Sequence, residues 1–193
     1  MAATGASATR GAWLRMVPNA LTLARLAALP VLLVVLARAP GPTSVTAGLI
    51  FGAVAVTDFL DGWLARALRA ESAFGRIADP LADRLLVGVG LVGVILLDRM
   101  HWAAPVTLIT RDVLLIAGFV ALARIGVLMR VDMAGKVSSA LTMFATGGCL
   151  LFAGVWVEVL MWIAVALALV TFAHYSSRGA RAWRSARGGS ISA

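Results

Sequence analysis

Charged residues are scarce in this 193-residue chain, and acidic residues are the scarcest: 13% of all residues are charged, with nine Asp or Glu against 17 Lys or Arg. Ordinary globular domains are about half apolar and about a quarter charged. With 61% apolar residues, this chain has the composition of a membrane protein. A membrane-spanning helix needs about 20 mostly apolar residues, so the chain is long enough for several spans but too short for an added soluble domain.

Cysteine is nearly absent, and the arginines form no basic face. The single Cys149 lies in the apolar stretch GGCLLF, so we interpret it as a core residue and predict no internal disulfide and no redox role. The net charge of +8 could indicate a nucleic-acid partner. Because the arginines separate apolar runs, a bilayer with anionic lipid is the better interpretation, and we predict no nucleic-acid partner.

The first apolar run has some features of a cleaved signal peptide. Arg10 and Arg15 precede it, and the sequence at 37–39 resembles a cleavage site. However, Pro40 would follow the cut, and Arg25 interrupts the run. We therefore predict a retained first helix.

The apolar runs predict an all-α, polytopic membrane protein with six transmembrane helices. The expected spans are 19–36, 44–65, 77–97, 106–128, 137–152 and 159–172. An interfacial or cytoplasmic segment, 1–18, precedes the membrane domain at 19–175, and a basic cytoplasmic tail, 176–193, follows it. Pro30 falls inside the first span, where helix packing in a membrane tolerates it.

The distribution of basic residues predicts the orientation. Arginine and lysine are concentrated in the N-terminal segment, in the connections after the second and fourth spans, and in the tail, whereas the other connections offer only Arg38 and Arg99. By the positive-inside rule, both termini are cytoplasmic in a multi-pass protein of the cell membrane.

Four of the few acidic residues are concentrated in one stretch, DFLDGWLARALRAESAFGRIADPLAD. Asp58 and Asp61 are three residues apart on one expected helix, and Asp79 and Asp83 are four apart on the next, so each pair shares a helix face. A single aspartate here would be a helix cap or part of a solvated turn. Four carboxylates near apolar spans repel one another unless cations or protons neutralise them, and oxygen-only ligands favour Mg²⁺ or Mn²⁺. We predict a site for two such ions, which suits diphosphate chemistry.

The same stretch resembles the signature of the CDP-alcohol phosphatidyltransferases, D-x2-D-G-x2-A-R-x8-G-x3-D-x3-D. Its fixed positions are Asp58, Asp61, Gly62, Ala65, Arg66, Gly75, Asp79 and Asp83. The resemblance implies an enzyme that transfers a substituted phosphate from a CDP-linked donor to an alcohol and releases CMP. It also implies a homodimer.

The resemblance assigns a role to each fixed position. Asp58, Asp61 and Asp79 would be ligands of the divalent metals. Asp83 would be the general base that activates the acceptor hydroxyl, and could also touch a metal. The remaining four positions would form the cradle for the cytidine diphosphate of CDP-diacylglycerol: Gly62, Ala65, Arg66 and Gly75.

Two further stretches concern the acceptor. The segment VPNALTLARL resembles the branch that makes phosphatidylglycerol phosphate and cardiolipin, with Asn19, Thr22 and Arg25 as its polar positions. Arg111, in TRDVLLIAG, is either a substrate contact or half of a buried ion pair with its neighbour, and Lys136, the only lysine, is either a phosphate contact or an interfacial residue.

The sequence leaves three functions open. TRDVLLIAG is more similar to cardiolipin synthases, which use phosphatidylglycerol as acceptor, and this is the preferred interpretation. The alternative is a phosphatidylglycerophosphate synthase, which uses glycerol-3-phosphate. The rival from another class is an acidic-site membrane transporter.

Overall fold

The computed structural model describes residues 23–67, 75–125 and 132–188, without the side chains of residues 58–81 and 185–188. In this part of the chain there are six helices and no strand, which confirms the predicted all-α class. The helices are an N-terminal helix, Leu23–Ala37, followed by α2, Val45–Ala67, α3, Gly75–Leu96, α4, Ala103–Arg124, α5, Met133–Leu151, and α6, Val155–Gly188. The N-terminal helix continues through Pro30, as expected for a packed membrane helix.

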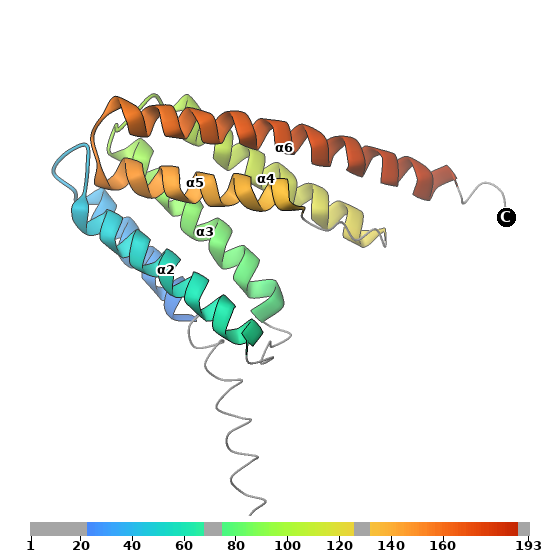
Figure 1. Ribbon diagram of the computed structural model, residues 1–193, viewed down its shortest axis with the longest axis horizontal. Helices are drawn as coiled ribbons and strands as arrows, with labels where there is room; N and C mark the ends of the chain where they lie inside the picture. Colours follow the sequence, from blue (N-terminus) through green and yellow to red (C-terminus); the bar gives the residue numbers. More distant parts are fainter. Residues whose placement is uncertain (1–22, 68–74, 126–131, 189–193) are drawn as a thin grey trace, which may run out of the picture.

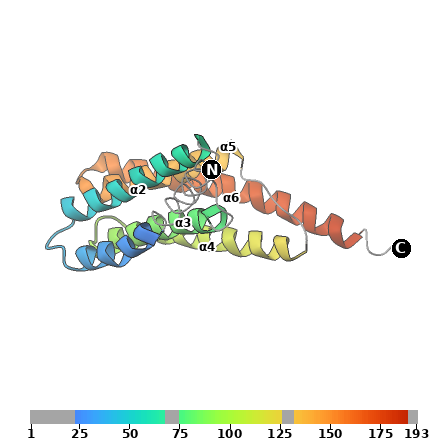
Figure 2. The same ribbon diagram turned by 90° about the horizontal axis from the view of Figure 1, so that it is seen from below.

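The helices form a bundle around α5, which packs against α2, α3 and α6 (Figure 1). Successive helices run in opposite directions, so the connections 38–44, 97–102 and 152–154 gather at one end. Toward the other end, α2 and α3 diverge from α4 and α6 (Figure 1). In both views α6 extends beyond the other helices (Figures 1 and 2), so much of the expected basic tail continues as helix.

Glycines allow the helices to approach closely in the core. A Cβ added at Gly93 would lie 2.5 Å from Cδ1 of Leu36 in the N-terminal helix. A Cβ added at Gly90 would lie 2.7 Å from both Phe51 Cε2 and Thr146 Cγ2. Small residues at such contacts are typical of helix packing in membranes, where van der Waals contact replaces the hydrophobic driving force. These two positions of α3 therefore fix its distance from three neighbouring helices.

Two of the described helices are long and apolar enough to cross a membrane. They are Ala103–Arg124, with a mean hydropathy of 2.0, and Val155–Arg184, with 2.3. Shorter apolar helices occur at Leu23–Ala37 and Val45–Thr57. The structure therefore supports a helical membrane protein, while the count of six spans remains a prediction.

An arginine joins two connections at the end where three connections gather. Arg99, which follows α3, donates to Glu158 Oε1 on α6 at 3.2 Å. The same guanidinium donates to the carbonyl oxygens of Phe152 at 3.2 Å and Gly154 at 3.4 Å. The α3–α4 and α5–α6 connections are thus held together by one side chain.

Asp132 performs a similar role at the opposite end, where it caps α5. Its Oδ1 accepts from the backbone N–H of Gly135 at 3.1 Å and from the hydroxyl of Tyr175 at 2.5 Å. His174 and Arg178 of α6 lie 3.4 and 3.5 Å from Oδ2. The hydrogen bond from Tyr175, followed by that from Gly135, holds the pKa of Asp132 below its ordinary value. This capping residue therefore ties the start of α5 to α6.

Candidate active site

The signature residues lie on two neighbouring helices. Five of them are in the last part of α2, and three are in the first part of α3. The helical backbone at both segments bears out the expected geometry: a three-residue and a four-residue spacing each place two aspartates on one helix face. Since α2 and α3 pack against each other, both pairs belong to the same region of the bundle.

Asp83 is the one signature residue whose side chain the structure describes. It is exposed, and it forms no ion pair with any other side chain in the described part of the chain. The next residue, Arg84, does not pair with it because its guanidinium binds Asp112 of α4 instead. The carboxylate of Asp83 therefore keeps its oxygens available, as a general base or a metal ligand requires.

The side chains of the other seven signature residues lie outside the described set, which contains no group of three metal-ligating residues. The donor chemistry nevertheless fits a hard divalent ion, because the acidic residues at 58, 61, 79 and 83 offer only carboxylate oxygens on two adjacent helices.

A partly buried ionic cluster joins α3 to α4 near Asp83. Asp112 Oδ1 accepts from Arg84 and, at 2.7 Å, from Nη1 of Arg111. The Arg111 side chain is 4% exposed, against 15% for Asp112 and 27% for Arg84. Arg111 thus forms the ion pair with Asp112 that was one of its two interpretations, and its role as a substrate contact stays a prediction. Because one carboxylate serves two guanidinium groups, the cluster keeps a net charge of +1.

Hydroxyl groups extend this cluster to α5 and α6. Nη2 of Arg111 donates to Thr171 Oγ1 at 2.9 Å, and Thr171 in turn lies 3.4 Å from the hydroxyl of Ser138. Nη2 of Arg84 donates to Ser139 Oγ at 3.4 Å. The Nε of Arg111 is buried without a hydrogen-bond partner in the described part of the chain. Polar side chains of this network therefore link α3, α4, α5 and α6.

Arg25, a predicted acceptor-site residue, lies where the N-terminal helix meets α2. It is buried, and together with Ala24, Ala53, Val54 and Thr57 it lines a cavity of about 200 Å³. Thr57 is the residue before Asp58, so the structure brings Arg25 to the part of α2 that leads into the aspartates.

Of the other predicted acceptor residues, the structure describes the side chains of Arg111 and Lys136, and neither lines this cavity. Lys136 is exposed in the first turn of α5 and shares no described hydrogen bond with the Arg111 cluster. Asn19 and Thr22 lie outside the described residues. Neither Arg111 nor Lys136 lines the cavity at Arg25, and a shared acceptor pocket stays a prediction.

Arg84 and Thr171 are the polar residues that the sequence interpretation missed. Arg84 carried a usable signal, because it is a charged residue in an apolar segment directly after the last aspartate of the signature. Thr171 carried none, since one threonine in an apolar helix has no distinctive spacing. Its contact with Arg111 joins residues 60 positions apart.

The chain is similar to known phosphatidyltransferases over most of its length. Residues 15–170 match the sequence model of the family described as CDP-alcohol phosphatidyltransferase. A CDP-diacylglycerol–glycerol-3-phosphate 3-phosphatidyltransferase of Rickettsia felis is 30% identical over 169 residues, covering 82% of this chain and 92% of that protein. A probable phosphatidylglycerophosphate synthase of Mycobacterium tuberculosis is 34% identical over 173 residues, covering 84% and 81%. A relative from Bacillus subtilis, with the same name as the Rickettsia protein, is 28% identical and covers 83% and 93%.

Proposed function

We propose that this chain, which belongs to the CDP-alcohol phosphatidyltransferase family, transfers the phosphatidyl group of CDP-diacylglycerol to glycerol-3-phosphate, forming phosphatidylglycerol phosphate and CMP. The observation that carries the proposal is that the full signature, Asp58 to Asp83, lies on the adjacent helices α2 and α3 in a chain whose relatives bear the name of this reaction. Family membership also removes the transporter alternative, because the relatives are named as transferases.

Glycerol-3-phosphate is a better acceptor candidate than phosphatidylglycerol, which the sequence interpretation preferred. That preference rested on the resemblance of the stretch TRDVLLIAG, in which Asp112 directly follows Arg111, to cardiolipin synthases. In the structure Asp112 is shared with Arg84, so a net positive charge remains. The names of the relatives point the same way, since those compared are named for glycerol-3-phosphate or for phosphatidylglycerophosphate.

The chain's own residues divide the reaction between them. We assign Asp83 to accept the proton from the glycerol-3-phosphate hydroxyl. The hydroxyl oxygen then bonds to the phosphorus that carries diacylglycerol, and the bond from this phosphorus to CMP breaks. Asp58, Asp61 and Asp79 would hold two divalent ions, whose contribution is to neutralise the diphosphate and stabilise the leaving CMP. Gly62, Ala65, Arg66 and Gly75 would cradle the cytidine diphosphate.

The described charges support a cytoplasmic site. The end of the bundle at which α2 meets α3 also holds Arg124, Lys136 and the arginines of late α6, whereas the opposite end holds only Arg38 and Arg99 in the described part of the chain. By the positive-inside rule the aspartates then face the cytoplasm, where glycerol-3-phosphate is water-soluble and accessible. We extend this to a multi-pass protein of the cell membrane with both termini cytoplasmic.

The test uses the purified protein in detergent with CDP-diacylglycerol and Mg²⁺, and offers glycerol-3-phosphate and phosphatidylglycerol in separate reactions. Mass spectrometry should detect phosphatidylglycerol phosphate and CMP in the first reaction and no cardiolipin in the second. Cardiolipin without phosphatidylglycerol phosphate would overturn the acceptor assignment.

A matched pair of variants checks the site itself. Asp83→Asn should abolish product formation, whereas Asp98→Asn, in the α3–α4 connection at the opposite end of the bundle, should leave it unchanged. Equal activity of the two variants would remove Asp83 from the mechanism.

A further inference from the structure

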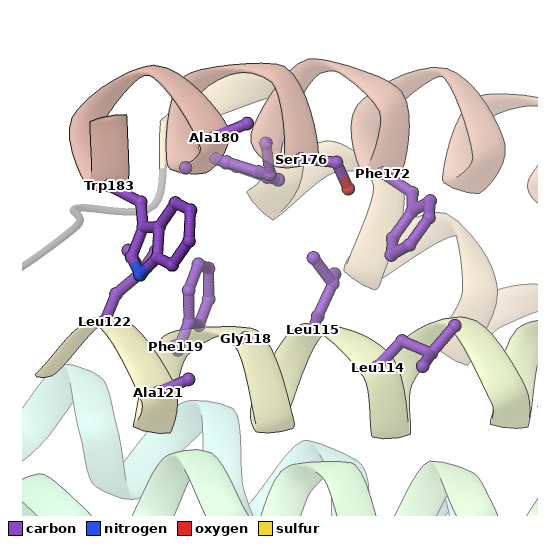
Figure 3. Close-up of a pocket in the computed structure, with 12 residues that line it drawn as sticks. Leu114, Leu115, Gly118, Phe119, Ala121, Leu122, Phe172, Ser176, Ala180 and Trp183 are labelled. Atoms are coloured by element: carbon purple, nitrogen blue, oxygen red, sulfur yellow. The ribbon is translucent and has the colours of Figure 1, made fainter. Parts of the chain in front are cut away.

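An apolar groove lies between α4 and α6, apart from the α2–α3 signature (Figure 3). It has a volume of about 370 Å³. Its α4 wall extends from Leu114 to Leu122 and its α6 wall from Phe172 to Trp183. Leu115 and Phe119 point from α4 toward α6, and Trp183 closes one end (Figure 3).

Water is a poor occupant of this groove. A bound water needs two to four polar partners, and the two polar groups of the lining other than the indole of Trp183 are on Tyr175 and Ser176. The Tyr175 hydroxyl already donates to Asp132 and accepts from the Asp132 backbone N–H. Among the described helices, α4 and α6 are the two whose length and composition would let them cross a membrane, and the side chains that line the groove between them are mostly apolar. A lipid acyl chain therefore matches it better than water does.

The surroundings of the groove favour a negatively charged headgroup. Exposed arginines follow the lining residues at the Trp183 end of the groove: Arg184 comes directly after Trp183 on α6, and Arg124 comes two residues after Leu122 in the last turn of α4. In the described part of the chain, the acidic residue at this end of the two helices is Asp132, which already contacts Tyr175, His174 and Arg178. Basic residues beside a pocket between membrane helices attract anionic lipid headgroups, and a tryptophan at such a rim is typical of the membrane interface.

We propose that the α4–α6 groove is a binding site for one acyl chain of an anionic glycerophospholipid from the surrounding membrane. The chain would enter beside Trp183 and extend toward Phe172 and Leu114, while the phosphate remains among the arginines at the end of the groove. This site is separate from the signature residues of α2 and α3, so it does not depend on which acceptor the enzyme uses.

Gly118 allows the groove to be filled without disturbing its walls. It lies in the α4 wall, and a Cβ added there meets no atom within 4 Å. Gly118→Leu should therefore occupy the space of the acyl chain. Gly52 on α2 is a matched control, because a Cβ added there also meets no atom within 4 Å and Gly52 is outside the groove.

Trp183 serves as the reporter. A variant that retains this tryptophan and has phenylalanine at the other five is reconstituted into vesicles of phosphatidylcholine, and brominated phosphatidylglycerol or brominated phosphatidylcholine is titrated in as a fluorescence quencher. We expect phosphatidylglycerol to quench at about fivefold lower mole fraction than phosphatidylcholine at low salt, with the difference shrinking at high salt. Gly118→Leu should remove most of the quenching, and Gly52→Leu should leave it unchanged.

The proposal fails if the two lipids quench equally, since the site would then not select an anionic headgroup. It also fails if neither lipid quenches Trp183, because the groove would then be covered by protein, such as a second copy of the chain. A second measurement avoids dependence on the tryptophan-poor variant: native mass spectrometry of the chain with all its tryptophans should retain phosphatidylglycerol, and Gly118→Leu should lose it while Gly52→Leu does not. Equal retention by both glycine variants would refute the assignment.

Discussion

Loss of the Asp112 carboxylate should destabilise the helix bundle most, because it is the one described carboxylate that lies between two guanidinium groups. Asp112→Asn keeps the size of the side chain but raises the charge of the Arg84–Arg111 cluster from +1 to +2. Removing one partner of a buried ion pair costs about 3–5 kcal/mol. Since Arg84 and Asp112 are partly exposed, we expect the low end of that range, about 3 kcal/mol.

This loss should be visible in thermal unfolding. For a chain of this size, about 1 kcal/mol corresponds to roughly 2–4 °C, so Asp112→Asn should lower the apparent Tm by about 6–12 °C. The measurement is intrinsic fluorescence of the detergent-solubilised protein at one fixed heating rate, because membrane proteins commonly unfold irreversibly.

Two variants test the electrostatic cause. Arg84→Gln leaves one guanidinium on one carboxylate, so the cluster becomes neutral and the loss should be clearly smaller than for Asp112→Asn. Glu158→Gln removes a pair in which the carboxylate side chain is 41% exposed, and it should cost below about 1 kcal/mol. If Arg84→Gln destabilised the protein as much as Asp112→Asn, charge imbalance would not be the reason, and the reasoning would be refuted.

Four further outcomes follow from the site and the fold. Asp83→Asn should reduce kcat by about 10²–10⁴-fold with little change in Tm, measured by CMP release; a near-normal kcat would exclude a general base at this position. Asp61→Asn should raise the Mg²⁺ concentration for half-maximal activity by at least about tenfold. Mutation of residues that only hydrogen-bond to a metal ligand already lowers metal affinity by about tenfold or more. Gly93→Ala should lower the apparent Tm, because its Cβ would lie 2.5 Å from Leu36 Cδ1, and an unchanged Tm would show that the Leu36 side chain can move aside. Asp132→Ala should destabilise the protein at pH 7, and this loss should shrink progressively as the pH falls below about 3.9: folding lowers the pKa of Asp132, so its contribution is present above the unfolded pKa of about 3.9 and is lost as the pH falls through the folded pKa.

The sequence by itself determined the helical class, the approximate helix positions and the family. The apolar runs and the turn residues between them are local features, so the predicted span 44–65 corresponds to α2, Val45–Ala67, and 77–97 to α3, Gly75–Leu96. The signature could be recognised because its residues lie within two consecutive helices, where sequence spacing sets the helix face. The end of α6 was harder to predict, because an exposed basic helix has no apolar periodicity to mark where it stops.

Only the tertiary structure decided which polar groups meet across helices. The spacing of residues along one helix does not specify how far that helix is rotated against its neighbours; the packing of side chains such as Leu36 against Gly93 does. That rotation directs Arg84 to Asp112, and it brings Thr171 to Arg111. The groove between α4 and α6 arises in the same way. The space between two apolar helix faces depends on how the helices pack, and the sequence of each helix alone does not specify that packing.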